Sequence, residues 1–155
     1  MTVFKTRNFS FIVLSIVVGI SSIYLFLDNK IKSVERANLE NNLSRMIEMQ
    51  KHGEIKFIDF SIIATFSWDK LYILGPYVRL EKVPLKNHWP NSFPTSIEYS
   101  DGFVLLAFSN KKNVVQYLEY KRGTCDFSNA SNIQGYDRYN TLFIVDNKNR
   151  CVPVN

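Results

Sequence analysis

Glycine and histidine are scarce in this chain of 155 residues, which contains six glycines and two histidines. The glycine-rich loops that bind nucleotides are absent, and so is the G-x-S-x-G turn of serine hydrolases. The histidines, His52 and His88, lie far apart, and no C-x-x-C pair is present, so no zinc site is predicted. The sequence also predicts no other cofactor and no catalytic centre.

A concentrated basic region is also lacking. The net charge is +5 at pH 7, and charged residues make up 21% of the chain. The basic pairs Lys111-Lys112 and Lys121-Arg122 are isolated, so they are interpreted as solvated turn residues rather than a phosphate-binding patch. No nucleic-acid partner is predicted. Hydrophobic residues make up 46% of the chain, which is enough for one folded domain.

No charged residue occurs in residues 9–27, which begin at Phe9, end at Leu27 and read FSFIVLSIVVGISSIYLFL. A helix of this length measures roughly 28 Å, which matches the hydrocarbon core of a membrane. The segment is long for a signal peptide and has no small-x-small cleavage site, so an uncleaved signal anchor is favoured over a cleaved signal. Ser15 and Gly19 have the spacing of closely packed membrane helices, although two small residues in any apolar helix fit equally well.

Basic residues flank the anchor on both sides, and the count on the two sides is nearly equal. A short basic tail without acidic residues favours a cytoplasmic N-terminus. The only cysteines, Cys125 and Cys151, both follow the anchor, and an even pair fits a disulfide in an oxidising compartment. Two free, buried cysteines are the alternative.

Four segments are therefore expected: a cytoplasmic tail (1–8), the anchor (9–27), a stalk or packing helix (28–52) and an extracytoplasmic domain (53–155). The third segment contains no proline or glycine, and Gly53 is the expected stop. Its apolar residues fall near one helical stripe, which consists of Ile31, Val34, Leu39, Leu43, Met46 and Ile47.

After Gly53 the pattern changes to short runs rich in β-branched and aromatic residues. Residues 103–108 are apolar throughout, which predicts a central strand buried on both faces. Asp101-Gly102 predicts a hairpin turn before it, and residues 123–139 look irregular. The other strand-like runs are 55–66, 68–74, 96–100, 114–121, 141–145 and 151–154. This order predicts an α+β fold in which an antiparallel sheet of about six strands packs on a helix.

The run Trp68-Asp69-Lys70-Leu71-Tyr72-Ile73-Leu74-Gly75-Pro76-Tyr77 resembles the WDxxYxxGPY block of small, uncharacterised bacterial envelope proteins, many of them lipoproteins. The similarity covers residues 55–122 and includes the later apolar strand with its Asn-Lys-Lys-Asn turn. This chain departs from the lipoprotein members because it has a membrane helix in place of the lipid-bearing cysteine. The resemblance implies an extracytoplasmic location in a bacterium, and it implies no activity. Together with the anchor, it predicts a single-pass protein of the inner membrane with its domain in the periplasm.

The aromatic residues of this block have two interpretations. In the first, they close one end of the sheet, and Asp69 accepts hydrogen bonds from nearby backbone groups. In the second, they form a recognition surface together with His88 and Trp89. The packing interpretation is favoured because large aromatic side chains are usually buried. The candidate binding surface consists of Trp68, Asp69, Tyr72, Tyr77, His88 and Trp89.

The leading hypothesis for function is a non-enzymatic envelope protein that binds a protein partner, such as an immunity or accessory protein. The sheet face or the loop containing Pro84, Pro90 and Pro94 would form the contact. One alternative is an envelope hydrolase, with candidate site residues Asp59, Asp69, His88 and Cys125. Another is an assembly factor that acts through its membrane helix. The sequence predicts no oligomeric state.

Overall fold

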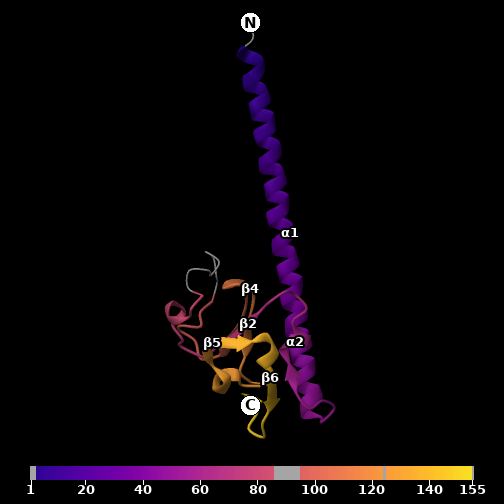
Figure 1. Ribbon diagram of the computed structural model, residues 1–155, viewed down its shortest axis with the longest axis vertical. Coiled ribbons are helices and arrows are strands. Elements are labelled where there is room, and N and C mark those ends of the chain that lie inside the picture. Colours follow the sequence, from indigo (N-terminus) through magenta and orange to yellow (C-terminus); the bar gives the residue numbers. More distant parts are fainter. Residues whose placement is uncertain (1–2, 86–94, 124, 155) are drawn as a thin grey trace. The chain divides into compact units, whose positions relative to one another are not determined.

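The structure is a computed structural model that describes residues 3–85, 95–123 and 125–154, with side chains described from Leu14 onward. Its first element is α1 (Val3–Lys51), so the predicted anchor and the predicted stalk helix are parts of one helix (Figure 1). The chain divides into two compact units, Met1–Val34 and Glu35–Asn155.

In the first unit, the large apolar side chains of α1 are exposed to solvent. Between Leu14 and Leu27 their exposed fractions range from 49% to 73%. This part of the helix is long and apolar enough to cross a membrane, and none of its apolar window is buried. Side chains of this kind exposed on every face of a helix are typical of a segment surrounded by lipid.

In the second unit, the last turns of α1 contribute to the core. Leu39, Leu43 and Ile47 are spaced four residues apart and are at most 1% exposed. The predicted stripe is correct from Leu39 onward, whereas Ile31 and Val34 are more than half exposed and lie in the first unit.

Gly53 ends the helix, as predicted. It has a φ of +76°, and its N–H donates to Gln50 O while the N–H of Glu54 donates to Met49 O. This pair of bonds is the Schellman arrangement, which favours glycine because the position needs a left-handed backbone.

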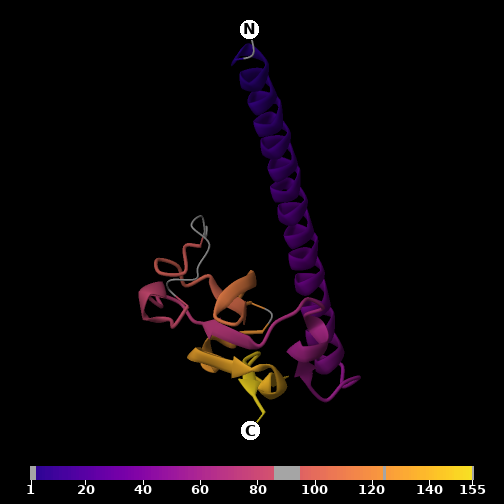
Figure 2. The ribbon, with the colours of Figure 1, turned by 45° about the horizontal axis from the view of Figure 1, so that its top comes forward.

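The α+β class is confirmed, but the strands form two antiparallel sheets rather than one (Figures 1 and 2). One sheet has the order β4-β3-β2-β5 and the other the order β1-β6-β7. The strands are β1 (Ile58–Asp59), β2 (Lys70–Leu74), β3 (Phe103–Asn110), β4 (Asn113–Lys121), β5 (Asn132–Asp137), β6 (Leu142–Val145) and β7 (Cys151–Pro153). Short helices are α2 (Phe60–Ile63), η1 (Leu80–Lys82), η3 (Phe127–Ala130) and η4 (Arg138–Asn140).

The four-stranded sheet is buried on both faces, and β3 lies between β2 and β4, as predicted. One face contributes Leu71 and Ile73 to a core shared with α1 and the smaller sheet. That core is rich in aromatic side chains, and Phe60 packs with its ring centroid 5.6–6.0 Å from those of Phe108, Phe127 and Phe143. The other face contributes Tyr72 and Leu74 to a smaller core with Val83, Leu85 and Ile97.

The prediction of one long strand over residues 55–66 was wrong. The structure has only the short β1 there, followed by α2. The side chain of Asp59 explains the change, because its Oδ1 accepts a hydrogen bond from Ser61 N at 2.8 Å and caps the new helical turn. Ile62, which a continuous strand would place on the same face as Ile58 and Phe60, is 69% exposed as a result.

Two further strand predictions were wrong. Residues 96–100 form no strand and contain a turn at 97–99, so Asp101-Gly102 does not join two strands of a hairpin. Residues 132–137, expected to be irregular, form β5 at the edge of the larger sheet. Their polar sequence (NIQGYD) gave no strand signal because an edge strand can leave its side chains only partly buried.

Candidate functional site

The turn between β3 and β4 has an unusual backbone. Lys111 and Lys112 have φ values of +50° and +71°, the combination found in tight hairpin turns that favour Asn-Gly. Lysine in this left-handed region costs free energy, of order 1 kcal/mol or more per residue. The turn itself was predicted from the sequence, whereas this strain was not.

Asp69 holds the turn in place. Its Oδ2 accepts a hydrogen bond from Lys111 N at 2.7 Å, and its Oδ1 accepts one from Ser109 Oγ at 3.1 Å. The N–H of Asp69 in turn donates to Ser109 O at 2.8 Å. The prediction that Asp69 accepts hydrogen bonds from nearby backbone groups is confirmed, and its carboxylate acts here as a clamp on the turn.

Tyr72 lies beside this clamp, on the face of β2 that carries the smaller core, and is 4% exposed. A Cβ atom on Gly135 of β5 would lie 3.0–3.2 Å from atoms of its ring, and Gly135 has a φ of +77°. Only glycine fits both conditions. Burial raises the pKa of Tyr72, the Ser109 hydroxyl opposes this, and Asp69 and Asp137 add to the increase. The phenol therefore stays neutral at physiological pH.

These residues border a cleft of about 490 Å³. Three of the residues that line it are lysines, namely Lys70, Lys111 and Lys112. Lys70 Nζ lies 3.7 Å from Asp137 Oδ1 and donates to Gln134 O at 3.2 Å. The residues that line the cleft are Asp69, Lys70, Tyr72, Pro84, Ser109, Lys111, Lys112, Gln134 and Asp137.

A second hollow, of about 510 Å³, is lined by Tyr77, Arg79, Glu81, Glu98 and Tyr99. Tyr77 is 61% exposed and Tyr99 is 82% exposed. Tyr77 has a φ of +61°, and its N–H donates to Ile97 O at 2.9 Å. Glu98 Oε1 accepts from Leu80 N at 2.7 Å, so it fixes the backbone under the hollow.

The members of the candidate binding surface do not come together. Trp68 is 3% exposed in the larger core, with its ring 5.2 Å from that of Phe108, whereas Tyr72 lies in the smaller core. Asp69 and Tyr72 line the cleft, and Tyr77 lines the second hollow. His88 and Trp89, like Pro90 and Pro94, lie outside the described residues.

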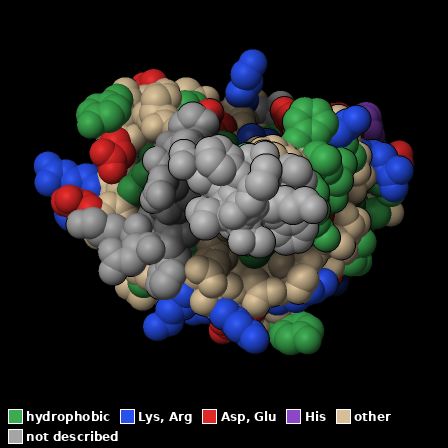
Figure 3. Space-filling view, turned by 90° about the horizontal axis from the view of Figure 1, so that it is seen from above, with side chains coloured by type: hydrophobic (Ala, Val, Ile, Leu, Met, Phe, Trp, Pro, Cys, Tyr) green, Lys and Arg blue, Asp and Glu red, His purple; other side chains and the backbone are tan. Residues whose placement is uncertain are grey.

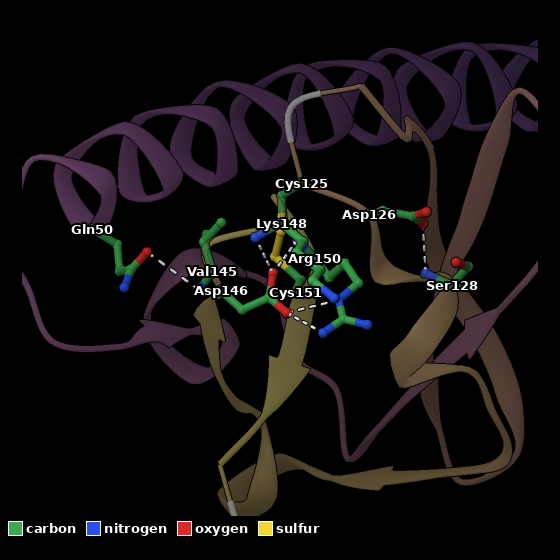
Figure 4. The surroundings of a disulfide bond; sticks show 9 residues. All are labelled: Gln50, Cys125, Asp126, Ser128, Val145, Asp146, Lys148, Arg150 and Cys151. Carbon is green, nitrogen blue, oxygen red and sulfur yellow. Dashed lines mark hydrogen bonds and ion pairs between the residues drawn. A yellow bond between two sulfur atoms is a disulfide. The ribbon is translucent and has the colours of Figure 1, made fainter.

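Cys125 and Cys151 form a disulfide, with their Cα atoms 5.5 Å apart (Figure 4). The bond joins the segment after β4 to β7. Cys151 N donates to Asp126 O at 3.0 Å, and Gln50 Oε1 of α1 accepts from Val145 N at 3.3 Å. Covalent and hydrogen bonds thus connect the end of the chain to the rest of the second unit.

Two ion pairs flank the disulfide. Burial raises the pKa of Asp126, but Arg122, 2.7 Å away, and the N–H of Ser128 outweigh it, so that pKa is lowered. The hydrogen bond from Arg150 is the largest cause that lowers the pKa of Asp146 to about 2. Arg150 Nη2 lies 2.6 Å from Asp146 Oδ2. Both carboxylates therefore remain charged in all but strongly acidic solution.

The residues considered for a hydrolase have structural roles where the structure describes them. Asp59 caps α2, Asp69 clamps the β3–β4 turn, and the sulfur of Cys125 is bonded to Cys151. His88 lies outside the described residues. Within the described ranges, no three His, Cys, Asp or Glu side chains are grouped closely enough to hold a metal ion.

Basic side chains lie at separate places around the face shown in Figure 3, with acidic side chains between them. The local gathering of lysines at the cleft was not visible in the sequence, because Lys70 is far from the Lys111-Lys112 pair along the chain. The pairing of Lys70 with Ser109 across β2 and β3 brings them together. Tyr99 was missed for another reason, since no motif in the sequence includes it.

Comparisons of the chain with protein-family models, with curated proteins and with solved structures found no match. The resemblance carried by the block from Trp68 to Tyr77 therefore stays a prediction.

Proposed function

We propose that this chain is a single-pass protein of a bacterial inner membrane whose second unit lies in the periplasm and binds a protein partner without catalysing a reaction. The exposed apolar surface of α1 between Leu14 and Leu27 supports the membrane anchor. The disulfide supports an oxidising compartment for the second unit, because such bonds persist there and are rare in a reducing cytoplasm. An immunity or accessory role fits this arrangement.

The hollow between Tyr77 and Tyr99 is the observation that carries the binding proposal. Tyrosine and arginine are enriched among the residues that dominate protein–protein affinity, and here two exposed tyrosines line one hollow together with Arg79, which pairs with Glu81 at 3.9 Å. Tyr77 is held in a left-handed conformation that presents its ring at the surface at a cost in free energy. A rigid aromatic side chain loses little conformational entropy when a partner covers it.

The proposal of a non-enzymatic role rests on the candidate catalytic residues. Asp59, Asp69 and Cys125 each have a structural partner that accounts for them. An acid or base in a working site is expected to face a reacting group rather than serve as a cap or clamp. We therefore favour binding over hydrolysis.

The test is quantitative affinity capture from envelope extract with the full chain in a non-ionic detergent. The variant combines Tyr99→Ala with Tyr77→Asn, since asparagine tolerates a positive φ. Tyr139→Ala is the matched control, because Tyr139 is 89% exposed and does not line the hollow. We expect a stoichiometric partner that the double variant loses and the control retains. Retention of every captured protein by the double variant would refute the role of this hollow.

A further inference from the structure

The cleft beside the β3–β4 turn has an excess of positive charge. Three lysines and two aspartates line it, so basic residues outnumber acidic ones by one. Asp69 is engaged by Ser109 and by the backbone of Lys111, and Asp137 lies near Lys70. Among the described residues, neither the Lys111 nor the Lys112 ammonium forms an ion pair. Two positive charges are thus available to a ligand at one rim.

The backbone that presents these charges is strained. A two-residue turn with both φ values positive would be most stable with Asn-Gly, yet two lysines occupy it. Asp69 stabilises this turn through its backbone rather than by neutralising an ammonium group. Strained residues held by a dedicated partner are concentrated at ligand sites, which points to a role for the lysine side chains beyond the turn.

The cleft also has two hydroxyl groups, of which that of Ser109 already donates to Asp69, and one apolar wall. Ser109 is 1% exposed and Tyr72 is 4% exposed, and both line the cleft. Gly135 allows the close approach that seats the Tyr72 ring. Pro84 provides a further nonpolar surface. A volume of about 490 Å³ suits a small molecule or a headgroup.

From these observations we propose that the cleft binds the phosphate group of a small molecule or of a lipid headgroup, with Lys111 and Lys112 as the main charged contacts. Lysine binds phosphate as a point charge, and two or three ammonium groups match a dianionic phosphate. Lys70 lies on the same rim and adds to the positive potential. This site is separate from the hollow at Tyr77 and Tyr99 and does not depend on a protein partner.

The test is an NMR titration of the full chain in a non-ionic maltoside detergent with inorganic phosphate, with sodium chloride at equal ionic strength as the reference. The variant is Lys111→Asn with Lys112→Gly, which removes both charges and installs the preferred turn sequence. Lys148→Ala is the matched control, because Lys148 is an exposed lysine in the turn between β6 and β7. Tyr99→Ala tests independence from the second hollow.

We expect saturable shifts of the amide signals around Ser109 and Lys112. The double variant should weaken phosphate binding by about tenfold, since exposed charge contacts are individually weak and two are removed. It should also unfold at a higher temperature, so lost binding could not be attributed to lost structure. Lys148→Ala and Tyr99→Ala should bind as the wild type does. Absence of saturable binding, or equal binding by the double variant, would overturn the proposal.

A second arm distinguishes the sources of the phosphate group. The titration is repeated in nanodiscs of phosphatidylcholine with and without phosphatidylglycerol. If a lipid headgroup occupies the cleft, phosphatidylglycerol will compete and weaken phosphate binding in the wild type but not in the double variant. If the ligand is a free phosphate compound, the affinity will be equal in both discs and in the phosphate-free maltoside, since phosphatidylcholine carries a phosphate group of its own. Either outcome supports a phosphate site and identifies its source.

Discussion

The two parts of α1 differ in apolar content and in how they bury it. Between Leu14 and Leu27 the large apolar side chains are exposed on every face of the helix. From Leu39 to Ile47 only one face is apolar, and it is buried except for Met46, which is partly buried. The first part needs only hydrophobicity, since lipid has no fixed shape to match. The second part needs particular shapes at particular positions, because protein cores are close-packed.

This difference predicts which substitutions should lower the stability of the protein. A substitution in the first unit should be tolerated if it stays apolar. The same substitution in the second unit should cost free energy in proportion to the packing or bonding it removes.

The largest expected effect is that of Leu43→Ala. Leu43 is 0% exposed, so the change should leave a cavity and lower the free energy of unfolding of the second unit by about 3–5 kcal/mol. The matched change, Leu25→Ala, affects a side chain that is 66% exposed and should leave that free energy unchanged. Urea unfolding of the full chain in detergent, followed by tryptophan fluorescence, measures both. Equal losses in the two variants would mean that the comparison is wrong.

Removal of the disulfide should have the next largest effect. Cys125 and Cys151 are 26 residues apart, and closing a loop of that size should stabilise the second unit by roughly 3 kcal/mol. The Cys125→Ala and Cys151→Ala double variant should therefore unfold at lower urea concentration, while extraction of the chain from membranes stays unchanged. A double variant as stable as the wild type would show that the bond adds nothing to the fold.

A glycine in each unit provides a third contrast. Gly135→Ala forces a side chain onto the Tyr72 ring at a positive φ, so it should cost about 2 kcal/mol. Gly19→Ala meets nothing within 4 Å and sits inside a helix, so it should leave the second unit as stable as before. Thermal unfolding of both variants tests this contrast. A Gly135→Ala variant that unfolds at the wild-type temperature would contradict it.

The smallest effect concerns acid. The pKa of Asp146 in the folded chain is about 2, below its ordinary value of 3.8. The carboxylate therefore stabilises the fold in full above about pH 5, and that contribution is lost as the pH falls toward 2. Asp146→Asn should flatten the loss of stability between pH 5 and pH 2. Asp28→Asn, which removes an ion pair with Lys32 in the first unit, should keep the wild-type profile of the second. If Asp146→Asn lost stability between pH 5 and pH 2 as steeply as the wild type, the attribution of this loss to Asp146 would be wrong.

The elements that the sequence predicted well are those with strong periodic or continuous apolar signals. The buried strand over 103–108, its partner over 114–121 and the helix stop at Gly53 are present in the structure. Predictions failed where a single side chain redirected the backbone, as Asp59 does by capping α2, or where an edge strand is polar, as in β5.

The candidate site was less predictable than the fold. Asp69 and Tyr72 were singled out, but the lysines that accompany them come from β2 and from the β3–β4 turn, which only the tertiary structure brings together. Strain at Lys111 and Lys112 has no sequence signature, because the pattern Asn-Lys-Lys-Asn does not specify φ. Trp68 and Tyr72 were expected to act together, yet they lie in different cores. Residues four apart share a face only within one regular strand, and Trp68 precedes β2.

The central claim is that the first unit spans a membrane and the second lies on the side opposite the cytoplasm. The most direct measurement is protease digestion of intact spheroplasts that express the full chain, followed by alkaline carbonate extraction of the membranes. The account predicts that external protease removes the second unit, while the fragment containing residues 9–27 stays in the carbonate-washed membrane. A second unit that is protected until the spheroplasts are lysed, or a chain released by carbonate, would contradict it.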